Sequence, residues 1–191
     1  MKKVLIGLGV ILVLFILFLW WGSTVETPES GGTTSENNTT ELNNQNFTSD
    51  KGNFSIYFES TPQYVPGTMT TSKGETYPTH LYQTRAADGS VWQALYTEYP
   101  KSSDVSNPEN VLLNTVRGTE SSIEGKITKT QIGKYQGFPS IDYIISIPKE
   151  KYVFKGRNIL NGHKLYSVVY IFDEGKEVSS ENFFNSLKIG K

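Results

Sequence analysis

The stretch YVFKGRNILNGHKLYSVVYI, residues 152–171, contains the strongest structural signal of the chain. Asn161-Gly162 separates two runs of alternating side chains, and this dipeptide is typical of the two-residue type I′ turn of a β-hairpin. A turn centred there pairs Leu160 with His163, Asn158 with Leu165, Phe154 with Val169 and Tyr152 with Ile171. Most of the large apolar side chains then gather on one side of an antiparallel pair.

Further strands are expected on the amino-terminal side of this hairpin. Phe54, Ile56 and Phe58 alternate in a short strand, which Thr61-Pro62 and Pro66-Gly67 are expected to end. Residues 79–84 lead through the turn signal Asp88-Gly89 to a strand over 91–99. Residues 127–132 and 141–147 also alternate, and Pro148 closes the second of these segments.

Two helices are expected among these strands. Ser106 and Glu109 have the spacing of a capping box with Pro108 in the first turn, which predicts a helix that ends near Gly118 or continues to Gly125. Ser179 or Ser180 caps a short closing helix with Phe183, Phe184 and Leu187 on its inner side. The order of elements predicts an α+β fold, mainly an antiparallel sheet packed by helices.

The amino-terminal segment has the features of a membrane anchor. Residues 4–21 carry no charge and no strongly polar side chain, and this run is long enough to cross about 30 Å of hydrocarbon. A cleaved signal peptide is the alternative, but Trp20 and Trp21 occupy the best-placed cleavage positions. Lys2 and Lys3 precede the run and glutamates follow it, so a transmembrane anchor over residues 1–22 is predicted to keep its amino terminus in the cytoplasm.

Residues 23–50 are rich in Ser, Thr, Asn and Glu and contain hardly any large apolar side chain. Such a composition buries too little apolar surface to offset its ordering entropy, which predicts a disordered linker. The chain is thus expected to carry an extracytoplasmic α+β domain over residues 51–191. This places the domain on the far side of a cell membrane, in the periplasm or outside the cell.

The composition excludes several classes of function. The chain has no cysteine, which rules out disulfides, zinc thiolate sites, a thiol nucleophile and a lipid-modified cysteine. Its formal net charge is −1, which argues against nucleic acid as a partner.

Residues at both ends of the predicted domain resemble the PsbP/Mog1 superfamily. They are the Phe54-x-Ile-x-Phe58 strand that leads into Thr61-Pro62, the helix after Tyr99-Pro100, and the ending Leu165-Tyr166 to Phe183-Phe184-Asn185-Ser186-Leu187. The resemblance implies an antiparallel sheet between helices in an α-β-α sandwich. It also implies an accessory or protein-binding role, because PsbP supports photosystem II and Mog1 binds a small GTPase. No family site residue has a counterpart in this chain.

The sequence contains no recognised catalytic or metal-binding motif. His80 and His163 are the two imidazole groups, and the position of His163 after the turn predicts exposure to solvent. Asp142 lies on the face of its strand opposite Ile141 and Tyr143, where it is either solvated or buried with a partner. Asp173, Glu174 and Glu177 lack the spacing of a calcium loop. No catalytic, cofactor-binding or metal-binding residue is therefore predicted.

Basic residues concentrate between positions 126 and 164, where only Asp142 and Glu150 oppose them. In the predicted hairpin, one face carries Lys155, Arg157, Lys164, Tyr166 and Tyr170. This face is a candidate surface for a protein partner, an anionic envelope polymer or lipid headgroups. The alternative is a hydrophilic sheet edge on which lysines prevent aggregation.

The first functional hypothesis is a non-enzymatic accessory or binding module, held outside the membrane by residues 4–21 and requiring no cofactor. The competing hypothesis is an extracytoplasmic hydrolase with an unrecognised active site. A deep pocket lined by Asp142 or by a histidine with a strongly shifted pKa would favour the enzyme. A third hypothesis is a purely structural role within a membrane assembly.

Overall fold

The computed structural model describes residues 46–70 and 74–190, which form two antiparallel sheets and two helices. The seven-stranded sheet has the order β3-β4-β5-β9-β8-β7-β6, and the three-stranded sheet has the order β1-β2-β10. The strands of the larger sheet are β3 (Gln63–Thr70), β4 (Thr76–Arg85), β5 (Val91–Glu98), β6 (Lys126–Tyr135), β7 (Phe138–Ile147), β8 (Tyr152–Asn161) and β9 (Lys164–Asp173). The remaining elements are β1 (Asn46–Ser49), β2 (Phe54–Tyr57), β10 (Lys188–Ile189), α2 (Pro108–Ser122) and α3 (Glu181–Ser186).

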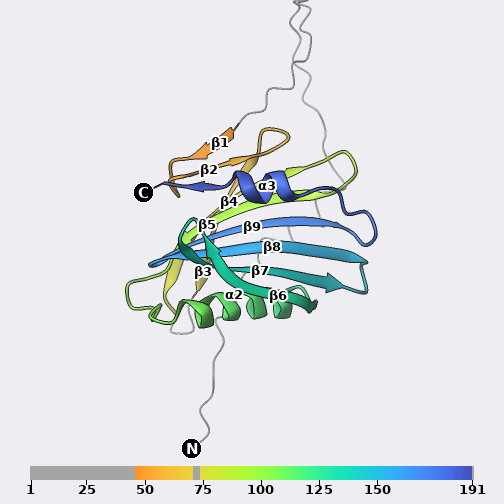
Figure 1. Cartoon of the computed structure of the whole chain (residues 1–191). Coiled ribbons are helices and arrows are strands. Elements are labelled where there is room, and N and C mark those ends of the chain that lie inside the picture. The colour runs from red at the N-terminus through yellow and green to blue at the C-terminus, as the bar shows by residue number, and fades with distance from the viewer. Residues whose placement is uncertain (1–45, 71–73, 191) are drawn as a thin grey trace, which may run out of the picture.

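Helix α2 covers one face of the larger sheet (Figure 1). Leu112, Thr115, Val116 and Thr119 are its buried residues, and their spacing places them along one side of the helix. They pack in a core with inward-facing residues of the sheet that include Ile141, Ile145 and Leu165. Burial of this apolar side stabilises α2 against the sheet.

The three-stranded sheet and α3 cover the opposite face of the larger sheet (Figure 1). The core on this side is rich in aromatic rings. Trp92 of β5 and Tyr170 of β9 stack with their centroids 4.0 Å apart, and Phe183 of α3 meets Trp92 edge-on at 5.0 Å. These contacts fix α3 on the sheet, because offset and edge-on ring pairs add to the free energy of apolar burial.

The predicted α+β sandwich, with a sheet packed between helices, is wrong. Strands make up 54% and helices 15% of the described residues, and one face of the large sheet is covered mainly by a second sheet. The physical reason is that β10 pairs with β2 at Ile189 and Phe54, so short strands from both ends of the domain supply the covering layer. Only the six-residue α3 accompanies them.

The predicted anchor over residues 1–22 and most of the predicted linker lie outside the described residues. Within the described ranges, no helix is long and apolar enough to cross a membrane. The end of the predicted linker, however, forms strand β1. Phe47 packs against Tyr82 with the ring centroids 4.6 Å apart, and the Ser49 hydroxyl donates to the Tyr82 hydroxyl over 2.8 Å. One aromatic side chain thus joins this polar segment to the core.

The central hairpin forms, but with a register two residues from the predicted one. Leu160 pairs with Leu165, and Phe154 pairs with Ile171. Asn161 belongs to β8 and pairs with Lys164, so the turn residues are Gly162 and His163. Only Gly162 of these two has a positive φ, +59°, as the first central residue of a type II′ turn requires. A shift of two residues leaves every side chain on its predicted face.

Two other boundaries also differ from those expected. Pro66 and Gly67 lie inside β3, which tolerates a proline because it is an edge strand of the larger sheet. Helix α2 is capped by Asn107, whose side chain accepts from the Asn110 backbone N–H over 3.1 Å, and it continues past Gly118 to Ser122.

Candidate functional site

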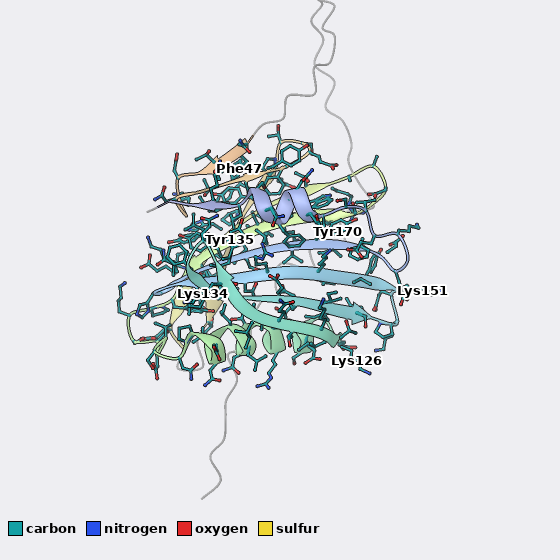
Figure 2. The ribbon with its side chains drawn as sticks, in the orientation of Figure 1. Phe47, Lys126, Lys134, Tyr135, Lys151 and Tyr170 are labelled. Atoms are coloured by element: carbon teal, nitrogen blue, oxygen red, sulfur yellow. The ribbon has the colours of Figure 1, made fainter. Side chains whose placement is uncertain are left out.

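A groove of about 390 Å³ lies between α3 and the strands β6, β7 and β8, on the sheet face opposite α2. Strands β6 and β7 form its outer floor, and α3 forms a wall. Figure 2 shows this end of the sheet, with Lys126 and Lys134 near the two ends of β6. The lining residues are Lys129, Gln131, Asp142, Tyr143, Ile144, Lys155, Gly156, Arg157, Glu181, Phe184 and Asn185.

The wall of the groove is fixed to its floor by the turn between β6 and β7. The Tyr135 hydroxyl lies 2.8 Å from the carbonyl oxygen of Leu187 and 3.2 Å from that of Phe184. Gln136 accepts from the Ile189 backbone N–H over 3.1 Å and donates to the Leu187 carbonyl over 2.5 Å. These bonds satisfy carbonyls that the end of a helix leaves unpaired, so they hold α3 in place.

A β-bulge near the start of β6 directs Lys129 into the groove. Ile127 pairs with Ile145 and packs into the core under α2, whereas Lys129 pairs with Ile144. The register shifts between these two β6 residues. Without this shift, Ile127 and Lys129 would point to the same face, because side chains alternate along a strand. The bulge therefore buries the isoleucine on one face and places the lysine on the other.

Arg157 and Asp142 form an ion pair on the groove floor. The Arg157 Nε donates to Asp142 Oδ1 over 2.6 Å, and Nη2 donates to Oδ2 over 2.9 Å. The Arg157 guanidinium also lies 4.7 Å from the centre of the Tyr135 ring. The Asp142 hydrogen bond raises the pKa of Arg157 above its usual value. The arginine is held rigidly, since a two-point bond fixes its plane and the aromatic ring supports its face.

Lys155 reaches across to the loop before α3. Its Nζ lies 2.7 Å from Glu177 Oε1, and the Lys155 side chain is 34% exposed. Lys129 and Glu181 are exposed at opposite sides of the groove. The groove therefore has two ion pairs, one exposed basic residue (Lys129) and one exposed acidic residue (Glu181). Its overall charge is close to neutral.

The predicted basic surface is not brought together as one patch. Of the five residues expected on this surface, Lys155 and Arg157 line the groove, whereas Tyr170 is buried in the core. Tyr166 is 2% exposed, and its hydroxyl donates to the Gly52 carbonyl over 3.0 Å, so it belongs to the core. Lys164 pairs with Asn161 at the turn end of the hairpin, about 20 Å along the strand from Lys155 at roughly 3.3 Å per residue.

The two histidines lie away from the groove. His80 of β4 stacks between Tyr64 and Tyr96, and its Nδ1 lies 2.8 Å from the Tyr64 hydroxyl. Burial, followed by the charge of Lys51, lowers the pKa of His80. His163 lies in the β8-β9 turn and is only partly exposed.

Two of the three acidic residues near the end of β9 form ion pairs. Asp173 pairs with Lys176, and Glu177 pairs with Lys155. Among the described residues, no group of three or more His, Asp and Glu side chains could hold a metal ion.

The residues that shape the groove are not predicted by the sequence. Lys129 is only one basic residue among several in its segment, because a bulge leaves no distinct mark in the sequence. Tyr135, Glu181 and Asn185 depend on the position of α3 against β6, which local patterns do not give. Asp142 lies on the face expected for it and has Arg157 as its partner, but its side chain is 47% exposed and therefore not buried.

The chain matches no family model and no curated protein sequence. Among solved structures, it resembles the solution structure of cyanobacterial PsbP (CyanoP) from Synechocystis sp. PCC 6803. The TM-score is 0.52 at 8% sequence identity, and the match covers 84% of this chain and 100% of that chain. At this identity the likeness concerns the fold alone. The PsbP-like fold expected from the sequence is thereby confirmed.

Proposed function

We propose that this protein is an accessory binding module, displayed outside a membrane, that holds part of a partner protein in the groove beside α3. The observation that carries the proposal is the groove itself, an open area of sheet with charged side chains held in fixed positions. Arg157 and Asp142 are oriented by each other, and Lys129 remains exposed beside them. Prearranged polar groups favour recognition, because little side-chain entropy is lost on binding.

The groove favours binding over catalysis. Its lining contains no Ser, Thr, Cys or His side chain, so the common pairing of a hydroxyl or thiol nucleophile with a histidine base is not present there. Asp142 does line the groove, as the hydrolase hypothesis required, but both of its carboxylate oxygens accept from Arg157. A carboxylate held in this way is a poor general base, since proton transfer would break the ion pair. The accessory role implied by the family resemblance points in the same direction.

The membrane placement in this proposal comes from the sequence. An anchor over residues 1–22 and a linker that ends before strand β1 at Asn46 would hold the domain within about 30 Å of the bilayer, by coil statistics. The lysines before the apolar run and the glutamates after it orient the domain outwards. This geometry suits a module that acts on other membrane or envelope proteins.

Photo-crosslinking in intact cells tests the binding role. A photoreactive amino acid is placed at Gln131 or at Asn185 on two sides of the groove, and at Arg117 on the exposed side of α2 as the control. We expect both groove positions to give an adduct of the same mass and Arg117 to give none. Arg157→Glu should abolish the adduct. Identical adducts from all three positions, or none from the groove, would contradict the proposal.

Protease accessibility tests the placement. Added protease should digest the domain in cells whose outermost envelope has been opened, while a cytoplasmic marker survives. The undigested protein should stay in the membrane fraction after extraction at alkaline pH. Digestion only after the cell membrane is lysed, or release into the soluble fraction, would refute the membrane-displayed arrangement.

A further inference from the structure

The edge of the larger sheet at β6 differs from the edge at β3. Strand β3 contains Pro66, which has no backbone N–H to offer to a neighbouring strand. Strand β6 contains no proline, and after the bulge its residues 129–135 pair with β7 in an unbroken register. Among the described strands, only β7 pairs with β6. At the start of β6 the Ile127 N–H already donates to Glu120 Oε1 over 2.8 Å. The outer backbone groups of residues 129–135 form a template for one more strand.

The charges of β6 select what can pair with it. Its sequence KITKTQIGKY carries Lys126, Lys129 and Lys134 and no acidic residue. Pairing with the β6 strand of a second copy would bring two sets of lysines together, which is unfavourable. The same lysines favour an acidic strand through charge complementarity. Lysines on this edge thus exclude a copy of the chain and attract a partner of opposite charge.

The two faces of β6 define the pattern of such a partner. The bulge places Lys126 and Lys129 on the α3 side of the sheet, paired with Ser146 and Ile144 of β7. Ile132 lies on the other face and is 47% exposed. Because side chains alternate along a strand, an added strand would present acidic residues to Lys126 and Lys129 and apolar residues beside Ile132, whose face also carries Lys134.

We infer that β6 is the docking strand for an extended acidic segment of a partner protein, in which Glu or Asp alternates with Val, Ile or Thr. The segment adds to the sheet as an eighth strand and completes the outer side of the groove. Main-chain hydrogen bonds supply affinity, and the alternating side chains supply specificity. This inference rests on the proposed binding role of the groove and names the chemistry of its partner.

Fluorescence anisotropy with synthetic peptides tests the inference on the full-length chain in neutral detergent. The probe is a labelled peptide of roughly nine residues, enough to span β6, with Glu alternating with Val and Thr. Its counterpart has Lys in place of Glu. We expect the acidic peptide to bind at low salt and the basic peptide not to bind.

Two variants test which charges matter. Lys126→Gln with Lys129→Gln should weaken binding of the acidic peptide about fivefold, the scale of two exposed ion pairs. Lys188→Gln, at an exposed lysine of β10 outside the groove, is the matched control and should bind as the unaltered chain does. Equal binding of the acidic and basic peptides, or equal loss in both variants, would overturn the assignment.

N-methylation of the acidic peptide tests the main-chain hydrogen bonds without altering the protein. One peptide is methylated at alternate amides and a second at the amides between them, so each loses the N–H groups of one edge. Only the peptide that loses the edge facing β6 should fail to bind. Undiminished binding of both methylated peptides would overturn strand addition. Self-association of the chain through β6 would also overturn the inference, because it would assign this edge to a second copy.

The outcomes separate this inference from the proposed function. If the groove positions capture a partner in cells but the acidic peptide does not bind, strand docking fails and the binding role stands. If the groove captures nothing and the peptide does not bind, both fail.

Discussion

Gly156 of β8 is the residue at which the sheet leaves the least room for a side chain. The Tyr143 ring from β7 lies over it, and the Tyr143 hydroxyl bonds to Ser167 of β9. A Cβ on Gly156 would overlap this ring. The Tyr143 side chain therefore reaches across β8 to β9 only because position 156 has no side chain.

Gly156→Ala is expected to lower the free energy of unfolding by about 1–3 kcal/mol, the usual cost of overpacking a core. Urea denaturation followed by circular dichroism measures this. Gly133→Ala on β6 is the control, because a Cβ there meets no atom within 4 Å. A smaller loss for Gly156→Ala than for Gly133→Ala would refute this account of the packing.

The Arg157–Asp142 ion pair is a second feature that depends on individual residues. Asp142→Asn removes the charge but keeps the shape, and we expect a loss of about 1 kcal/mol in unfolding free energy, because the pair is only partly buried. The loss should shrink at high salt. Lys149→Gln breaks the exposed pair with Glu124 and should leave the urea midpoint unchanged. Equal losses of unfolding free energy for both variants would show that the fixed position of Arg157 contributes nothing to stability.

The candidate site could be predicted only in part at this scale. Alternation along β8 correctly placed Lys155 and Arg157 on one face with Tyr166, because strand periodicity is a local property. Whether a residue of that face is covered depends on what packs above it. Tyr166 lies under the chain at Gly52, whereas Arg157 lies at the open groove. That difference arises from tertiary packing, which the local sequence does not encode.

At the scale of elements, α2 depends on its amino-terminal cap. Asn107→Ala should destabilise the domain by about 1 kcal/mol, since the first turn loses the acceptor for the Asn110 N–H. Ser106→Ala, at the residue that the capping-box pattern favoured, should have almost no effect on the urea midpoint. A larger loss for Ser106→Ala than for Asn107→Ala would show that Ser106 caps the helix, as the capping-box pattern predicts.

The strands show why some elements were predictable and others were not. The hairpin was recognised because Asn-Gly and the alternating runs on both sides are local signals. Its register was misjudged because Gly162 can serve as either the second residue of a type I′ turn or the first of a type II′ turn. Strands β1 and β10 are four and two residues long, so they form only through pairing with β2.

At the scale of the whole molecule, buried tyrosines govern the response to alkaline pH. Burial is the largest influence on each and raises its pKa, to about 12 for Tyr96 and Tyr143. The others with raised pKa values are Tyr77, Tyr99, Tyr166 and Tyr170. In the unfolded chain these groups ionise near the ordinary value of 10.0. Between these pH values the folded state holds more protons, so raising the pH favours unfolding.

The free energy of unfolding should thus stay level up to about pH 9 and fall from about pH 10 towards 12. Urea unfolding at a series of pH values measures it, with phenolate absorbance recorded in parallel. Tyr143→Phe should make the fall shallower. Stability that is unchanged at pH 11 would contradict this burial-based explanation.

The overall architecture was predictable to the level of an antiparallel sheet with a PsbP-like fold. The covering layers were not, because a strand that pairs across the whole length of the domain leaves no local pattern. Helices have strong local start and stop signals, so local sequence patterns overstate their share of the covering layers.

The small sheet joins both ends of the domain, since β10 pairs with β2 and the Gly190 N–H donates to the Asn53 carbonyl over 2.7 Å. Among the described strands, β2 is made early and β10 last. Strand β2 therefore has no β10 partner until the ribosome has passed Ile189. Until synthesis passes that point, the small sheet stays incomplete and the aromatic face beneath it stays partly uncovered.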